Sequence, residues 1–254
     1  MENTALVGLS RQVALARELD VIANNLANVN TAGFKAESAV FHEYLMPVAS
    51  AGDFGGGDRV LRYVQDRATW HDLSQGSTQT TGNPFDVAID GRGFLVVQTP
   101  RGERYTRNGA LQVNAQGQLV TSEGYVVQGD NGPIVLQQLD RQISISPDGR
   151  VAVIEGNSRQ ESQRGKLRVV GFARSSQLEK DGASTFSAPA GVAPQALANP
   201  RLIQGAIEKS NVKSVVEMTR MVEITRTYTQ IASILQQQSD MRKAAIQQLA
   251  EVPS

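Results

Sequence analysis

The distribution of glycine and proline constrains the fold of this chain most strongly. Residues 1–30 contain no proline and one glycine, and residues 206–252 contain neither. Thirteen glycines, by contrast, lie between Gly76 and Gly165. Helices tolerate such a density of glycine badly, whereas short strands joined by turns require it. The distribution therefore predicts a long helix at each end of the chain and β structure between them.

The predicted N-terminal helix carries a narrow apolar stripe. Its members recur at alternating steps of four and three residues: Leu15, Leu19, Ile22, Leu26 and Val29. This spacing is typical of a coiled-coil seam rather than of a broad globular face. A second apolar stripe runs from Leu6 to Ala16, rotated from the first. We expect the helix to end after Asn30, with Gly33 as its stop signal.

The predicted C-terminal helix has a seam of the same kind. Its members are Met221, Ile224, Tyr228, Ile231 and Leu235. An uninterrupted helix of some 44 residues would reach about 66 Å, which compact domains of this size rarely contain. The simplest arrangement pairs the two terminal helices with each other. Such a pair still leaves apolar faces open, so further burial is expected from other subunits.

The middle of the chain alternates with the period of two that is typical of strands. Phe85, Val87 and Ile89 share one face, and Asp-Gly and Asn-Gly turn signals separate successive runs. The fold class predicted is α+β, with paired, coiled-coil-like terminal helices and an inserted, mainly β domain. The expected parts are a discontinuous helical domain (1–30 with 206–254), a connecting segment (31–75), the β domain (76–176) and a return linker (177–205). Within the connecting segment, Gly52 to Gly57 predict a loop.

Asparagines crowd the end of the first helix at Asn24, Asn25, Asn28 and Asn30. Asparagine suits helix ends and turns, so one interpretation is a solvated, fraying terminus. The other is that the amides fix the register of a helix–helix contact, as polar core residues do in coiled coils. Asn24 and Asn28 would then share a face beside the leucine seam. The residues by themselves leave both interpretations open.

Composition excludes several classes of function. The 254 residues include 25 basic and 25 acidic side chains, so no basic excess favours nucleic acid. No apolar run reaches the 18 residues of a membrane-spanning helix. The absence of cysteine excludes disulfides and thiolate catalysis, and His42 and His71 are the only histidines. Asp86 and Asp90 would lie about 13 Å apart on a strand, too far for a glycosidase pair. We expect no enzyme activity, no catalytic residues, no cofactor and no metal site.

Three separated groups of motifs resemble the bacterial flagellar rod and hook proteins. ANNLANVNTAGFK (Ala23 to Lys35) resembles the N-terminal signature of that family. TGNPFDVAIDGRGF (Thr81 to Phe94), YTRNG (Tyr105 to Gly109) and LVTSEGY (Leu119 to Tyr125) resemble its central motifs. Ser210-Asn211-Val212, Glu217-Met218, Met221-Val222 and Arg226-Thr227-Tyr228 resemble its C-terminal helix. Arg92 and Lys213 stand where the family pattern has acidic residues. The length and the LRVVGFARSSQLEKDG stretch are more similar to proximal than to distal rod proteins, and the distal rod remains the alternative.

The resemblance implies a structural subunit of the flagellar basal-body rod. Such subunits polymerise through their terminal helices into the hollow periplasmic drive shaft. The implied partners are copies of the chain, other rod proteins and the flagellar export apparatus, without membrane insertion. We see no cleavable signal peptide, because the apolar run from Ala5 to Leu9 is too short for one. A secreted glycan-binding β module with helical flanks is the alternative from another class.

Overall fold

The computed structural model describes residues 2–47, 60–156, 160–182, 184–197 and 199–250. The chain forms two compact units. Unit 1 comprises residues 1–27, 37–70 and 213–254, and unit 2 comprises residues 28–36 and 71–212. The chain therefore passes between the units four times. The loop predicted at Gly52 to Gly57 lies outside the described residues.

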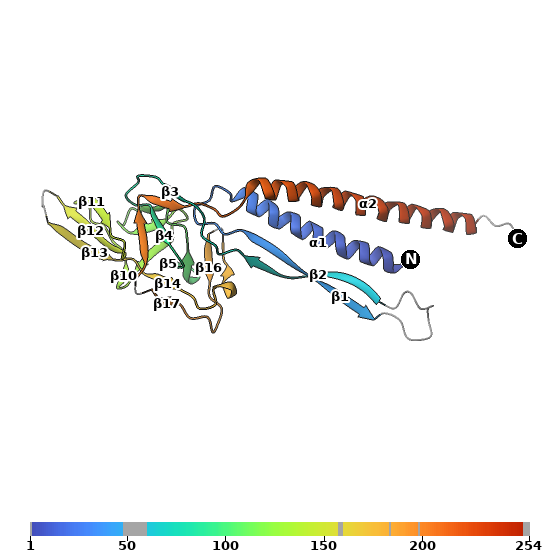
Figure 1. Cartoon of the computed structure of the whole chain (residues 1–254), viewed down its shortest axis with the longest axis horizontal. Helices are drawn as coiled ribbons and strands as arrows, with labels where there is room; N and C mark the ends of the chain where they lie inside the picture. Colours follow the sequence, from blue (N-terminus) through green and yellow to red (C-terminus); the bar gives the residue numbers. More distant parts are fainter. Residues whose placement is uncertain (1, 48–59, 157–159, 183, 198, 251–254) are drawn as a thin grey trace. The chain divides into compact units, whose positions relative to one another are not determined.

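Unit 1 contains two long helices, α1 (Glu2–Ala27) and α2 (Ser214–Ala250), and strands β1 (Glu37–Pro47) and β2 (Val60–His71), which pair with each other (Figure 1). The helices pack against each other in antiparallel orientation. Near one end of the pair, the Leu235 side chain fills the space beside Gly8. Further along, Arg220 donates two hydrogen bonds to Glu18, at 2.8 and 2.5 Å. Neither helix is both long and apolar enough to cross a bilayer.

Both helices are shorter than the sequence predicts. The first ends at Ala27 rather than after Asn30. A glycine is needed at position 33 for two reasons: its φ is +68°, and it lies very close to the backbone of Arg107 and Asn108. The second helix begins at Ser214 because residues 206–208 pair with residues 78–80 as strands. A segment that lacks glycine and proline can form a helix, but pairing with a strand elsewhere in the chain can still make it a β-strand.

Unit 2 is built from short antiparallel strands. They are β3 (Thr78–Thr80), β4 (Val87–Asp90), β5 (Phe94–Thr99), β6 (Gly102–Thr106), β7 (Leu111–Val113), β8 (Leu119–Thr121), β9 (Val126–Gly129), β10 (Gly132–Pro133), β11 (Asp140–Ile145), β12 (Arg150–Glu155), β13 (Glu161–Lys166), β14 (Val169–Gly171), β15 (Glu179–Lys180), β16 (Thr185–Ser187), β17 (Gln195–Ala196), β18 (Arg201–Gln204) and β19 (Ala206–Glu208), with a short 3-10 helix at Ser175–Gln177.

The main sheet of unit 2 has the strand order β15-β16-β6-β5-β9-β8-β7, with β10 added at β9, β14 added at β5 and β17 added at β14. A separate three-stranded sheet has the order β11-β12-β13, and two further pairs are β18-β4 and β19-β3. Strand β5 lies at the centre of the unit and is buried on both faces. Leu95 and Val97 pack into one apolar cluster, and Phe94 and Val96 pack into another. This explains why β5 begins with four consecutive apolar residues, 94–97, rather than with an alternating pattern.

The segment expected to be a return linker, 177–205, instead completes unit 2. Its strand β16 pairs with β6, β17 pairs with β14, and β18 pairs with β4. The prolines of this segment, Pro189, Pro194 and Pro200, lie between the short strands and not within them. Proline removes a backbone donor only at its own position, so strands of two to four residues fit between prolines.

Candidate functional site

The predicted helical seams lie largely out of solvent. Ile22 on α1 and Ile224 on α2 are buried. The remaining apolar seam residues are half-buried: Leu15, Leu19, Leu26, Val29, Met221, Tyr228, Ile231 and Leu235. Val29 lies beyond the end of α1, in unit 2. Since Leu235 packs beside Gly8, part of this seam is used within the chain, and its use between subunits stays a prediction.

A second set of apolar side chains on the same helices is exposed. On α1, Leu6, Leu9 and Val13 are 50%, 52% and 63% exposed. The spacing of these residues puts them on roughly the opposite side of α1 from the Leu15–Ile22 seam. On α2 the exposed apolar residues are Val215, Val216, Met218, Val222, Ile234, Met241 and Ile246. Exposed apolar side chains gathered on a helix are typical of an interaction site.

Of the clustered asparagines, Asn25 is the buried one. Its Nδ2 donates to the carbonyl oxygen of Glu37 at 2.8 Å, and its Oδ1 accepts the Glu37 N–H at 2.8 Å. The same Nδ2 lies 3.4 Å from Oε2 of Glu217 on α2. Asn25 thus holds the start of β1 to α1, a role that neither interpretation of the sequence includes. Asn24 is exposed, and Asn28 accepts a hydrogen bond from Thr31.

Unit 2 buries a charge cluster that the sequence analysis missed, formed by Lys35, Arg107 and Glu208. Lys35 Nζ lies 2.5 Å from Oε1 of Glu208, and Arg107 Nη1 lies 2.9 Å from Oε2. The three side chains are at most 3% exposed. Burial lowers the pKa of Lys35 below its ordinary value, although the Glu208 carboxylate acts in the opposite direction. Two cations therefore share one carboxylate away from water.

Backbone groups and aromatic rings complete the surroundings of this charge cluster. Lys35 Nζ also donates to the carbonyl oxygen of Ser74, and the Gly76 N–H donates to Oε1 of Glu208 at 2.9 Å. Arg107 Nη2 donates to the carbonyl oxygen of Gly91, and its guanidinium lies 5.4 Å from the centre of the Phe94 ring. A buried ion pair is stable only when such additional partners satisfy it.

Asn211 ties three chain segments together beside the charge cluster. Its Oδ1 accepts the Ala36 N–H at 2.8 Å, and its Nδ2 donates to the carbonyl oxygens of Asp72 and Ser74 at 2.7 and 3.2 Å. Its own N–H donates to the carbonyl oxygen of Phe34. The N-terminal signature, the YTRNG motif and the Ser210-Asn211-Val212 motif are therefore brought together in one place.

The sequence contained one signal for the charge cluster. In the stretch Ala206-Ile207-Glu208, the glutamate stands two residues from an alanine, so both point to the same face of a strand. Once Ala206 is known to be buried, Glu208 must be buried too. That signal could not be used without knowing that the segment is a strand.

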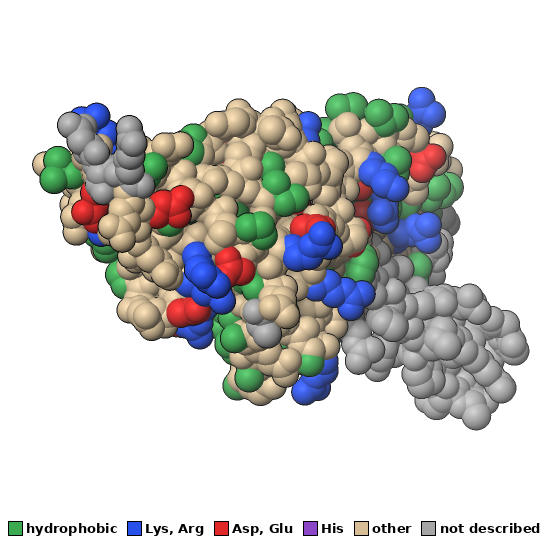
Figure 2. Space-filling view, turned by 60° about the vertical axis from the view of Figure 1, so that its left-hand side comes forward, with side chains coloured by type: hydrophobic (Ala, Val, Ile, Leu, Met, Phe, Trp, Pro, Cys, Tyr) green, Lys and Arg blue, Asp and Glu red, His purple; other side chains and the backbone are tan. Residues whose placement is uncertain are grey.

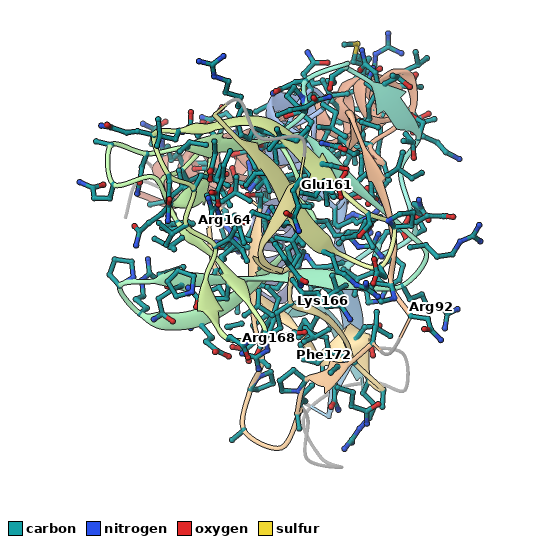
Figure 3. The ribbon with its side chains drawn as sticks, turned by 90° about the vertical axis from the view of Figure 1, so that its left-hand side faces the viewer. Arg92, Glu161, Arg164, Lys166, Arg168 and Phe172 are labelled. Atoms are coloured by element: carbon teal, nitrogen blue, oxygen red, sulfur yellow. The ribbon has the colours of Figure 1, made fainter. Side chains whose placement is uncertain are left out.

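Several other charged side chains of unit 2 form ion pairs. Arg164 binds Asp140 and Glu155 at 2.6 and 2.7 Å, and Arg168 lies 2.9 Å from Glu103. Arg164 and Arg168 lie along β13 and the approach to β14 (Figure 3). Basic and acidic side chains are interspersed over the face of the molecule in Figure 2. That face therefore has no surface of a single charge that could bind a charged ligand.

The two aspartates considered as a carboxylate pair have separate structural partners. Asp86 accepts hydrogen bonds from Thr81 and Asn83, at 2.6 and 3.0 Å, and so closes a turn. Asp90 lies 3.6 Å from Arg201 on the neighbouring strand. Within the part of the chain that the structure describes, no group of three or more histidine or acidic side chains is arranged to hold a metal ion.

Arg92 and Lys213 are both exposed, so replacing each with aspartate should barely change stability. Exposed substitutions usually change the free energy of unfolding by less than about 0.5 kcal/mol. Lys213 directly precedes α2, where aspartate is a favourable helix cap, so Lys213→Asp should be neutral or slightly stabilising. Thermal unfolding of both variants measures this. A loss of about 2 kcal/mol in either variant would show that the residue is structural.

Family models match all three parts of the chain that carry the charge cluster and Asn211. A model described as "Flagella basal body rod protein" matches residues 6–35. The "Flagellar hook protein FlgE/F/G D1 domain" matches residues 88–153, and "Flagellar basal body rod FlgEFG protein C-terminal" matches residues 203–248. Lys35 lies in the first range, Arg107 in the second, and Glu208 and Asn211 in the third.

Full-length relatives agree with these matches. The flagellar basal-body rod protein FlgF of Caulobacter vibrioides is 34% identical over 99% of this chain and 100% of its own length. FlgF of Mesorhizobium japonicum is 31% identical over 98% of both chains. The rod protein FlgG of Caulobacter vibrioides is 32% identical over 96% of this chain and 97% of its own. This chain belongs to the flagellar basal-body rod protein family.

Proposed function

We propose that the chain is a structural, non-enzymatic subunit of the flagellar basal-body rod, of the FlgF type with FlgG as the alternative. Identity to named rod proteins through both helices and the β unit supports this, with FlgF of Caulobacter vibrioides at 34% over the full length. The same continuous similarity disfavours a secreted glycan-binding module, in which only the β unit would need to be shared.

The subunit would polymerise through its terminal helices. The exposed apolar residues of α1 and α2 support this, because they leave faces of the helix pair uncovered in the single chain. In the assembly these faces would contact copies of the chain and other rod proteins in a coiled-coil-like layer. The seam residues and the asparagines at the end of α1 would contribute to the same layer, which would form the wall of a hollow periplasmic shaft. Passage through the flagellar export apparatus without a cleaved signal peptide completes this proposal.

Val13→Asp should abolish swimming in a motile host whose own copy is replaced, and rods should not be recovered. Val13 is 63% exposed, so the change spares the fold of the single chain. In an assembled contact it buries a carboxylate without a partner, which costs several kcal/mol. Swimming and recovery of rods are the two measurements.

Arg11→Asp is the matched control for that experiment, because Arg11 is exposed like Val13. Two residues along the helix, its side chain points about 160° away from Val13, so the change should be tolerated. Ile231→Asp should also stop swimming, but by a different route, since it disrupts the seam that is half-buried in the single chain. Normal swimming with Val13→Asp would show that the Leu6–Val13 face is not an assembly contact.

A further inference from the structure

Three segments of unit 2 carry the chain into and out of unit 1. Residues 28–36 follow α1 and precede β1, residues 72–77 follow β2, and residues 206–212 precede α2. Segments that connect two compact units are commonly exposed linkers with few contacts across them. Here the three segments are bound to one another within unit 2.

Backbone hydrogen bonds provide the first layer of this binding. The Gly33 N–H donates to the carbonyl oxygen of Glu208 at 2.8 Å, which joins the first segment to the third. The Asp72 N–H donates to the carbonyl oxygen of Ala36 at 2.9 Å, which joins the second to the first. The Lys209 N–H donates to the carbonyl oxygen of Ser77 at 2.8 Å, which joins the third to the second.

Side chains provide the second layer, and each one reaches more than one segment. Glu208 accepts from Lys35 on the first segment and from the Gly76 N–H on the second. Lys35 in turn donates to the carbonyl oxygen of Ser74 on the second. Asn211, on the third segment, accepts from Ala36 on the first and donates to Asp72 and Ser74 on the second, so a single amide links all three segments.

We propose that Asn211, together with Lys35 and Glu208, is a clamp that holds these three segments as one bundle, so that each leaves unit 2 from a fixed point. A force applied to any one of the segments is then distributed over all three. In a rod subunit the clamp would pass force from the helices and the β1–β2 pair into the β unit. That purpose rests on the proposed function, but the clamp itself is a property of the single chain.

Hydrogen exchange in the purified full-length chain tests the clamp. Asn211→Ala removes the bridging amide without changing charge. Amides in residues 33–36, 72–77 and 206–212 should exchange about tenfold faster or more, because each lost hydrogen bond lowers the cost of local opening. Exchange in β5 and β9, in the core of unit 2, should not change.

Asn114→Ala is the matched control. Like Asn211, Asn114 both accepts from the backbone and donates through its amide, but its two backbone N–H donors and its acceptor all lie within a turn at residues 114–118. Its replacement should speed exchange in that turn alone. Faster exchange confined to residues 210–212 in Asn211→Ala would overturn the clamp, and so would an equal increase throughout unit 2. Neither readout depends on rod assembly, so failure of the clamp and failure of the proposed function are distinguishable.

Discussion

Glu208→Gln should destabilise unit 2 by about 3–5 kcal/mol, because breaking a buried ion pair from one side leaves the other charges uncompensated. Here two cations, Lys35 and Arg107, lose their shared carboxylate, and both are buried in unit 2. Exchange of the β5 and β9 amides under native conditions reports the free energy of opening of this unit. In the variant, the free energy of opening of the slowest-exchanging amides in these strands should fall by the same amount.

Two variants make the test of the charge cluster specific. Glu179→Gln makes the same chemical change at an exposed position and should have little effect. Lys35→Met should lower the free energy of unfolding of unit 2 less than Glu208→Gln does, because it leaves one cation and one carboxylate paired. Equal effects of Glu208→Gln and Glu179→Gln would contradict the energetic role assigned to the cluster.

Gly33→Ala should be severely destabilising, and Gly82→Ala should be mildly so. The two glycines have nearly the same φ, +68° and +74°. Replacement by alanine should therefore cost a similar conformational free energy at both positions, about 1–2 kcal/mol. At Gly33 an added Cβ would also lie 2.3 Å from the carbonyl carbon of Arg107, whereas at Gly82 it would meet no atom within 4 Å. Overpacking of this kind adds a further 1–3 kcal/mol, roughly, or more when backbone must move.

Urea unfolding of both glycine variants beside the parent chain measures the difference. We expect Gly33→Ala to lose about twice the free energy that Gly82→Ala loses, or more. If the two lose the same amount, the close approach of the 28–36 segment to Arg107 contributes nothing, and conformational strain accounts for the whole effect.

Several features of the fold could be predicted because they depend on local spacing. The helical seams were visible as steps of three and four, and the structure places Ile22 and Ile224 of those seams in buried positions. The alternation of Val87 and Ile89 correctly indicated β structure, because β4 occupies Val87–Asp90, whereas Phe85 lies in the turn before it. Family signatures identified the rod proteins because their residues stand in contiguous runs, and the full-length relatives confirm that assignment.

Element boundaries at the ends of unit 2 could not be predicted in the same way. Residues 206–213 fit a helix by composition, but 206–208 pair with β3, which is more than a hundred residues earlier in the chain. The strands of residues 177–205 are two to four residues long, too short to show a period. Pairing with β6, β14 and β4 creates them, so no local pattern contains the information.

The sequence by itself determined the helix–β–helix order, the rod family and the absence of disulfides, because composition, period and contiguous motifs are local properties of the chain. Only the tertiary structure decided which charges are buried. Lys35 and Glu208 are 173 residues apart, and each taken alone has the pattern of a solvated surface charge. Burial of an ion is tolerated only beside its partner. Whether Lys35 faces water or Glu208 therefore depends on a long-range contact that no local pattern records.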